Sequence, residues 1–225
     1  MQSAAGASCR GGGEHLAIQR VDCYDDPRFR RTALLQHGGF LVGGQPWEIE
    51  ITGENLAVIH GEPGKLPRET LEELMNAFRF FAEHISRFID EAGRALGEFP
   101  APRLFPVELG AIQPSQFCVD EDKRSAVRTF VKMWRDIKIP LVRYGERFIS
   151  CDGHTRLSLA AELGFSQVLG FLTEENPLVF SFAEAAAARG VTSPREMQAL
   201  PHSEYEIKWN RFCDAFLKNQ SEKPV

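Results

Sequence analysis

The segment CDGHTRLSLAAELG, residues 151–164, places five polar or conformationally permissive residues directly before a helix-like pattern of apolar residues. Residues 147–150 follow the hairpin loop Gly145-Glu146, so the sequence predicts a strand there, a turn at Asp152-Gly153 and a helix that stops at Gly164. The first four backbone N–H groups of a helix have no partner within it. The sequence therefore predicts an anion site at this turn.

The residue types within the turn suit a phosphate group. Gly153 lets the backbone approach a ligand closely, Thr155 supplies a hydroxyl donor, and Arg156 supplies a planar set of donors that matches phosphate oxygens. His154 is available as a further donor or as an acid. Asp152 would repel a bare phosphate, so we expect it to hold a Mg²⁺ ion or to cap the helix. On spacing alone, a capping Asp152 and a surface ion pair of Arg156 stay open as the alternative.

The elements around the turn predict a small α/β domain over residues 99–175. Strands are expected over 139–144 and 147–150, joined by Gly145-Glu146, because glycine at the first position of a two-residue loop is typical of a type II′ hairpin. A strand around 107–112, a helix over about 120–134 and a strand over 168–172 complete the pattern.

The order of these motifs resembles the ParB/sulfiredoxin superfamily of small α/β nucleotide-binding domains. The resemblance covers residues 105–175 and rests on QPSQF (113–117), a helix, IPLVRYGERF (139–148) and then DGHTR before a helix. In that superfamily a Gly-x-x-Arg turn at a helix start holds nucleotide phosphates. The resemblance implies a mixed sheet with helices, and a site for ATP or ADP with Mg²⁺ that comprises Ser115, Asp152 (metal), Gly153, His154, Thr155 and Arg156.

Three branches of the superfamily match to different degrees. Sulfiredoxins carry a catalytic cysteine in Gly-Cys-His-Arg, but His154 stands at that position and Cys151 lies three residues upstream. ParB partition proteins carry Gly-Glu-Arg-Arg and add a basic helix-turn-helix, whereas the helix-turn-helix-like segment 183–200 has few basic residues. Free serine kinases have an Asp-Gly-His-x-Arg turn, which is the branch that this sequence resembles most closely.

The general base of that kinase branch is missing from its expected place. The branch uses a glutamate shortly after the first-strand proline, and Gln116 stands there instead. An amide accepts no proton at neutral pH, so phosphoryl transfer would need Asp120, Glu121 or Glu108 as the base, with His154 as an acid. Gln116 would then orient a hydroxyl group or water. Asp120 and Glu121 also suit the cap and first turn of a helix, and that alternative stays open.

The remainder of the chain predicts three further segments. Residues 1–30 lack periodicity and read as a flexible lead-in. Residues 31–98 predict an antiparallel meander over 40–59 and one long helix from Pro67 to about Ile89, roughly 35 Å at about 1.5 Å per residue. Proline residues near position 98 mark a linker. Residues 176–225 predict a C-terminal helical segment that includes a helix capped by Ser193.

Bulk composition bounds the function. The 225 residues are 43% hydrophobic and carry a formal charge of −5, which suits a globular α/β (α+β) protein and disfavours DNA as the main partner. No signal peptide or membrane span is visible, and the five scattered cysteines include no C-x-x-C pair, so we expect a cytoplasmic chain with reduced thiols. The expected ligands are a nucleotide and a small hydroxylated metabolite. A ParB-like regulator that binds DNA or a partner protein is the alternative, and a homodimer is left open.

Overall fold

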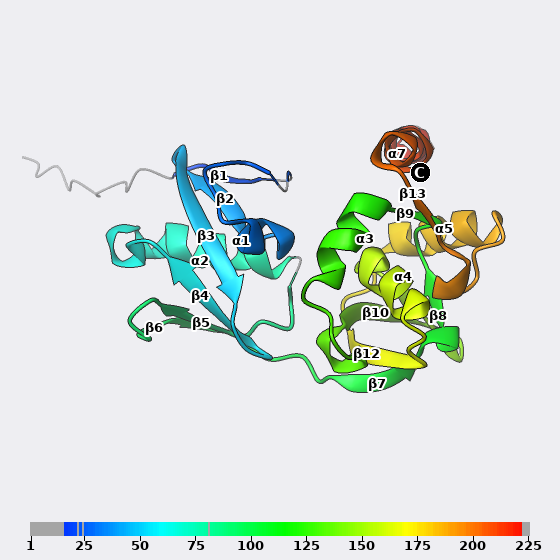
Figure 1. The fold of residues 1–225 in the computed structure, drawn as a ribbon, viewed down its shortest axis with the longest axis horizontal. Coiled ribbons are helices and arrows are strands. Elements are labelled where there is room, and N and C mark those ends of the chain that lie inside the picture. The colour runs from blue at the N-terminus through cyan, green and yellow to red at the C-terminus, as the bar shows by residue number, and fades with distance from the viewer. Residues whose placement is uncertain (1–15, 22, 24, 81, 222–225) are drawn as a thin grey trace, which may run out of the picture. The chain divides into compact units, whose positions relative to one another are not determined.

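The chain divides into two compact units, Met1–Ala101 (unit 1) and Pro102–Val225 (unit 2). This computed structural model describes residues 16–21, 23, 25–80 and 82–221 (Figure 1). Most of the lead-in expected over residues 1–30 lies outside the described residues. Its described part includes a strand, Ile18–Arg20, which pairs with the sheet of unit 1.

Unit 1 is built around a six-stranded sheet in the order β1-β2-β3-β4-β5-β6. Neighbouring strands are antiparallel except for β4 and β5, which are parallel, and the meander predicted over 40–59 is confirmed as β2, β3 and β4. The elements are β1 (Ile18–Arg20), α1 (Arg31–Leu35), β2 (Gly39–Val42), β3 (Gln45–Ile51), β4 (Leu56–His60), α2 (Arg68–Arg79), β5 (Arg87–Asp90) and β6 (Ala95–Glu98).

The single long helix predicted from Pro67 to Ile89 is wrong. Helix α2 ends at Arg79, and Arg87–Asp90 is strand β5 between β4 and β6. The Arg79 side chain stabilises the loop between α2 and β5, because its Nε donates to the Ile85 carbonyl at 2.9 Å. Of the apolar residues at helical spacing after Arg79, Ala82 and Ile85 pack into the same core from the loop, and Phe88 does so from β5. Spacing alone does not distinguish a short buried strand from more helix.

Unit 2 contains a five-stranded mixed sheet in the order β7-β12-β10-β11-β8 and a two-stranded parallel pair, β9 with β13. The hairpin predicted from Gly145-Glu146 is confirmed as β10 and β11. The helix expected to reach residue 134 ends at Arg128. The elements are β7 (Phe105–Glu108), β8 (Ile112–Pro114), β9 (Cys118–Asp120), α3 (Glu121–Arg128), β10 (Lys138–Tyr144), β11 (Arg147–Ser150), α4 (His154–Glu162), β12 (Gln167–Leu172), α5 (Pro177–Ala187), β13 (Gln198–Leu200), α6 (His202–Tyr205), a π-helix (Glu206–Asn210) and α7 (Arg211–Ser221).

Helices cover both faces of the five-stranded sheet in unit 2. Successive residues of β10 point to opposite faces: Leu141 packs with Leu157 of α4 in the larger core, and Val142 packs with Ala183 of α5 in a smaller one. This alternation is why β10 is apolar along most of its length. The fold class is therefore mixed α and β with a mixed sheet. In the described part of the chain, no helix combines the length and apolar character that crossing a membrane requires.

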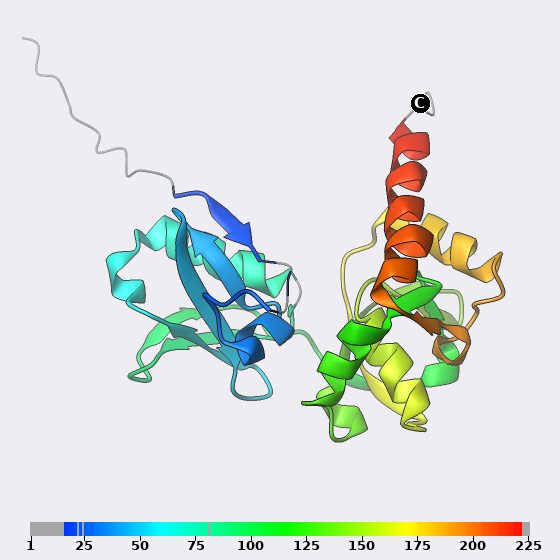
Figure 2. The ribbon, with the colours of Figure 1, turned by 45° about the horizontal axis from the view of Figure 1, so that its top comes forward.

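The C-terminal segment departs from the predicted run of helices. The helix expected after Ser193 is wrong, because a short 3-10 turn, Pro194–Glu196, leads into strand β13, which pairs with β9. The Glu196 carboxylate accepts hydrogen bonds from the backbone N–H groups of Thr192 and Ser193 at 2.6 and 2.9 Å. These bonds stabilise the single 3-10 turn. The second helix of a helix-turn-helix over 183–200 is therefore absent. Beyond β13, α6, the π-helix and α7 form one continuous helical rod (Figure 2).

Candidate phosphate site at the start of helix α4

The predicted strand, turn and helix over residues 147–164 are confirmed. Strand β11 ends at Ser150, α4 begins at His154, and Gly153 is the N-cap with φ +79 and ψ 19, a left-handed conformation that favours glycine. The Gly153 carbonyl accepts the first helical hydrogen bond, from Leu157 N–H at 2.9 Å. The N-cap residue is a glycine, so it supplies no side chain to cap this helix start. The first amides of α4 therefore keep the polarity that attracts an anion.

Strand β8 brings Ser115 to the turn, although 39 positions separate it from His154. β8 runs parallel to β11, with Pro114 opposite Ser150, so the chain leaves both strands at the same edge. Ser115 Oγ donates to the Ser150 carbonyl at 2.7 Å and lies 3.0 Å from His154 Nε2. Because the hydroxyl hydrogen is engaged, His154 Nε2–H is the donor to Ser115 Oγ. Two residues predicted to belong to one site thus meet directly.

Burial decides the charge of His154. The side chain is 8% exposed, and loss of hydration lowers its pKa from 6.5 to about 4, although the Asp152 carboxylate opposes this shift. The imidazole is therefore neutral at neutral pH. It joins the 115 loop to α4 by hydrogen bonding, and the positive charge of this turn comes from Arg156.

The depressed pKa of His154 predicts acid sensitivity. Between pH 6.5 and 4 the unfolded chain binds a proton at this position and the folded chain does not, so stability is complete above pH 6.5 and falls as the pH drops towards 4. The loss reaches about 2–3 kcal/mol. Urea titrations across this range should show a shallower pH dependence for His154→Gln than for the unchanged chain.

A second histidine supplies the control for that measurement. The Asp120 carboxylate, 2.7 Å from His202 Nδ1, raises the pKa of His202, so its contribution is present below pH 6.5 and is lost as the pH rises through the folded-state pKa. His202→Gln should therefore keep the slope between pH 6.5 and 4. A His154→Gln chain with the same slope as the unchanged chain would contradict the assignment.

The guanidinium of Arg156 lies against the turn. Its Nη1 donates to the Lys138 carbonyl at 2.9 Å, and its Nη2 lies 3.7 Å from Asp152 Oδ2. A Cβ atom on Gly153 would come within 3.2 Å of Nη2. Burial lowers the pKa of Arg156, but a guanidinium stays protonated at neutral pH. A fixed positive charge therefore stands beside the helix start, partly balanced by Asp152.

The donor set for a Mg²⁺ ion is limited to Asp152. Its side chain is about half exposed, 48%, at the edge of the turn. Mg²⁺ is commonly bound through one or two carboxylates together with substrate phosphates and water, so a single accessible aspartate fits an ion that arrives with a nucleotide. It does not suit an ion held by the protein alone. Within the described ranges, no group of three metal-binding side chains gathers anywhere.

The other predicted catalytic residues make their contacts elsewhere in unit 2. Gln116 Nε2 donates to the Cys118 carbonyl at 2.6 Å and to Tyr205 Oη at 3.1 Å. Asp120 is 1% exposed, caps α3 by accepting from the Asp122 N–H at 2.9 Å, and contacts His202. Glu121 is exposed, 4.0 Å from an Arg124 nitrogen. The alternative of Asp120 as a helix cap is therefore confirmed.

One residue near the turn escaped the sequence analysis. Ser150, the last residue of β11, is fully buried, and its Oγ has no hydrogen-bond partner among the described residues. Such a group costs free energy and calls for an explanation in a native structure. Its signal in the sequence was a serine after two apolar residues at the end of a strand, which is too common a pattern to single out.

Two cavities in unit 2 have walls made by other segments. One of 560 Å³ lies between β9, β13 and the C-terminal helices, and one of 480 Å³ lies beside Phe105 and Phe148. Residues 152–156 line neither of them. The candidate phosphate site is therefore not part of the wall of either cavity.

Comparisons with known proteins add little to this description. No family model matches the chain, and no curated protein matches it. The solved structures that resemble part of it include protein Atu1540 from Agrobacterium tumefaciens, at 14% identity and a TM-score of 0.32. The match covers 44% of this chain and 62% of that chain, so less than two thirds of the neighbour is spanned. A likeness at this level carries no argument about fold or function.

Proposed function

We propose that unit 2 is a ParB/sulfiredoxin-like domain that binds the phosphates of a nucleotide, ATP or ADP, at the turn before α4. One observation carries the proposal: the Arg156 guanidinium lies beside the start of a helix whose N-cap is Gly153, a glycine in the left-handed conformation. Backbone amides and a fixed guanidinium are the donors that phosphate oxygens accept. The contact between Ser115 and His154 supports the proposal, because it joins the QPSQF and DGHTR motifs on which the resemblance to the superfamily rests.

The contacts of Gln116 and Asp120 favour binding over phosphoryl transfer. The Gln116 amide donates to Tyr205 and to the Cys118 carbonyl, and the Asp120 carboxylate already accepts from α3 and His202. A general base must reach the hydroxyl group that it deprotonates. We therefore infer nucleotide binding with weak or no hydrolysis, while Mg²⁺ at Asp152 would balance the charge of the phosphates.

A ParB-like DNA regulator is the less favoured candidate. The segment expected to supply the recognition helix is a 3-10 turn followed by β13. The proposal predicts that nucleotide binding does not require DNA.

Calorimetry with ATP and ADP, each with Mg²⁺, tests the proposal. Arg156→Ala should weaken binding by about tenfold or more, because a lost charged hydrogen bond costs about 1.5–3 kcal/mol. Arg156→Lys should recover part of the affinity, since it restores the charge without the planar fork. Arg143→Ala, a matched loss of charge away from the turn, should leave the affinity unchanged.

Two results would overturn the proposal. One is the absence of ATP and ADP binding to the unchanged chain at millimolar concentration. The other is an Arg156→Ala chain that keeps the circular dichroism spectrum and the full affinity. Thr155→Ala provides a milder second variant if Arg156→Ala fails to fold, because Arg156 also donates to the Lys138 carbonyl within the fold.

A further inference from the structure

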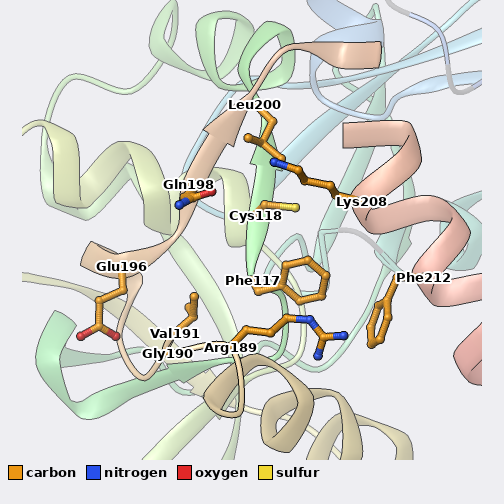
Figure 3. Close-up of a pocket in the computed structure, with 10 residues that line it drawn as sticks. All are labelled: Phe117, Cys118, Arg189, Gly190, Val191, Glu196, Gln198, Leu200, Lys208 and Phe212. Carbon is orange, nitrogen blue, oxygen red and sulfur yellow. The ribbon is translucent and has the colours of Figure 1, made fainter. Parts of the chain in front are cut away.

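The 560 Å³ cavity of unit 2 lies between strands β9 and β13 and the C-terminal helices (Figure 3). Its wall combines apolar side chains with two basic ones. The residues that matter for the argument are Phe117, Cys118, Arg189, Leu200, Lys208 and Phe212. Small-molecule sites have volumes of about 300–1,000 Å³, mostly apolar walls and a few placed polar groups. This cavity has the size of such a site, and its wall is of mixed polar and apolar character.

Arg189 is held in place by two aromatic rings. Its guanidinium carbon lies 4.7 Å from the centre of the Phe117 ring and 4.4 Å from that of Phe212, as Figure 3 shows. Within the described residues it makes one hydrogen bond, from Nη1 to the Ala185 carbonyl at 2.7 Å, and no ion pair. A guanidinium ordered by ring contacts keeps N–H donors available, and little freedom is lost when an anion binds.

A second basic group reaches the cavity from an irregular helix. Lys208 belongs to the π-helix Glu206–Asn210, and its Nζ lies 3.4 Å from Glu204 Oε2. π-Helical turns inside α-helical runs are rare and frequently lie at functional sites. Here the widened turn interrupts the rod between α6 and α7 at the residue that lines the cavity. This irregularity is independent of the cavity and of the contacts of Arg189.

The acidic group of the wall, Glu196, is ionised, because hydrogen bonds within the 3-10 turn lower its pKa. Glu196 accepts from Thr192 N–H and Thr192 Oγ1, and from Ser193 N–H, so its carboxylate serves the 3-10 turn. Cys118 is 2% exposed, and burial raises its pKa to about 11, so it stays a thiol at neutral pH. The cavity therefore offers two cations, one carboxylate already engaged by the turn, and apolar side chains, and its lining thiol is not reactive at neutral pH.

We propose that this cavity binds an organic carboxylate with an apolar body. The carboxylate would accept from Arg189 and Lys208, and the apolar body would lie on Phe117 and Leu200. This site is separate from the phosphate site at Arg156 and does not depend on it.

Calorimetry of the full chain with sodium octanoate tests the inference, with octan-1-ol and octylamine as ligands of the same length. Octanoate should bind at least about tenfold more tightly than either, because only its charge matches the two cations. Lys208→Gln and Arg189→Gln should each weaken octanoate binding about tenfold. Gln198→Trp, which places a large ring at a lining position, should abolish binding without a change in charge.

Arg143→Gln is the matched control, because Arg143 lines the 480 Å³ cavity and not this one. It should leave octanoate binding unchanged, and Lys208→Gln should leave ATP binding unchanged. Equal affinity for octanoate, octan-1-ol and octylamine would overturn the inference, as would no binding of octanoate. Weakening by Arg143→Gln alone would also overturn it. If Arg189→Gln loses its circular dichroism spectrum, the exposed Lys208 decides the test.

Discussion

Phe88→Ala should lower the free energy of unfolding of unit 1 by about 3–5 kcal/mol. The Phe88 ring is fully buried, and it makes edge-to-face contacts with Phe78 of α2 at 6.0 Å and with Phe99 at 5.7 Å between ring centres. Alanine would remove the ring from the place where the sheet, the helix and the segment after β6 meet. The cavity that remains cannot be refilled by parts of the chain held in three different elements.

Urea titrations read by hydrogen exchange measure this effect for each unit in the intact chain. Peptides from β2 to β6 should lose protection at lower urea concentration, whereas peptides from β10 to β12 serve as the internal control and should not change. Phe88→Leu fills most of the space and should cost distinctly less. A uniform shift of both units, or a loss in unit 1 below about 1 kcal/mol, would contradict the packing described for Phe88.

Phe88 was predicted to lie in a helix and lies in strand β5 instead. Residues 71–89 keep apolar side chains three and four apart, which predicts one helix, and six of these residues are buried: Leu74, Met75, Phe78, Ala82, Ile85 and Phe88. The reversal after Arg79 depends on hydrogen bonds of its side chain to the Ile85 and Glu83 carbonyls. Strand β5 then lies between two other strands. That pairing is not local, so no window of sequence contains it.

Local chemistry was the part that the sequence predicted well. Gly145 in the hairpin and Gly153 at the start of α4 both have positive φ, and each position was identified from its neighbours alone. The contact between Ser115 and His154 was expected only through the resemblance. Gln116 and Asp120 were predicted as catalytic residues of the same site. Their hydrogen-bond partners, Tyr205 and His202, come from the C-terminal part of the chain.

Gly153→Ala should produce the second large effect, in stability and in nucleotide binding. At φ +79 a Cβ atom costs about 1–2 kcal/mol, and this Cβ would also lie 2.6 Å from Ile139 Cδ1 in the core. Together these terms predict a loss of about 2–4 kcal/mol in the stability of unit 2. The same Cβ would press on the Arg156 guanidinium, 3.2 Å from its Nη2. Nucleotide affinity should therefore fall about tenfold or more even where the variant is fully folded.

Gly164→Ala is the matched control for that variant, because Gly164 follows the other end of α4 with φ +73 and no atom lies within 4 Å of its Cβ position. It should cost about 1–2 kcal/mol from the backbone conformation and leave nucleotide affinity unchanged. The difference between the two variants in urea titrations measures the stability cost of the contact with Ile139. The difference in ATP affinity, measured by calorimetry at a temperature where both variants are folded, measures the effect of displacing Arg156. Equal stability losses would show that Ile139 yields without cost. Equal affinities for ATP would remove Gly153 from the phosphate site, because that role requires the backbone and the guanidinium to share one small space.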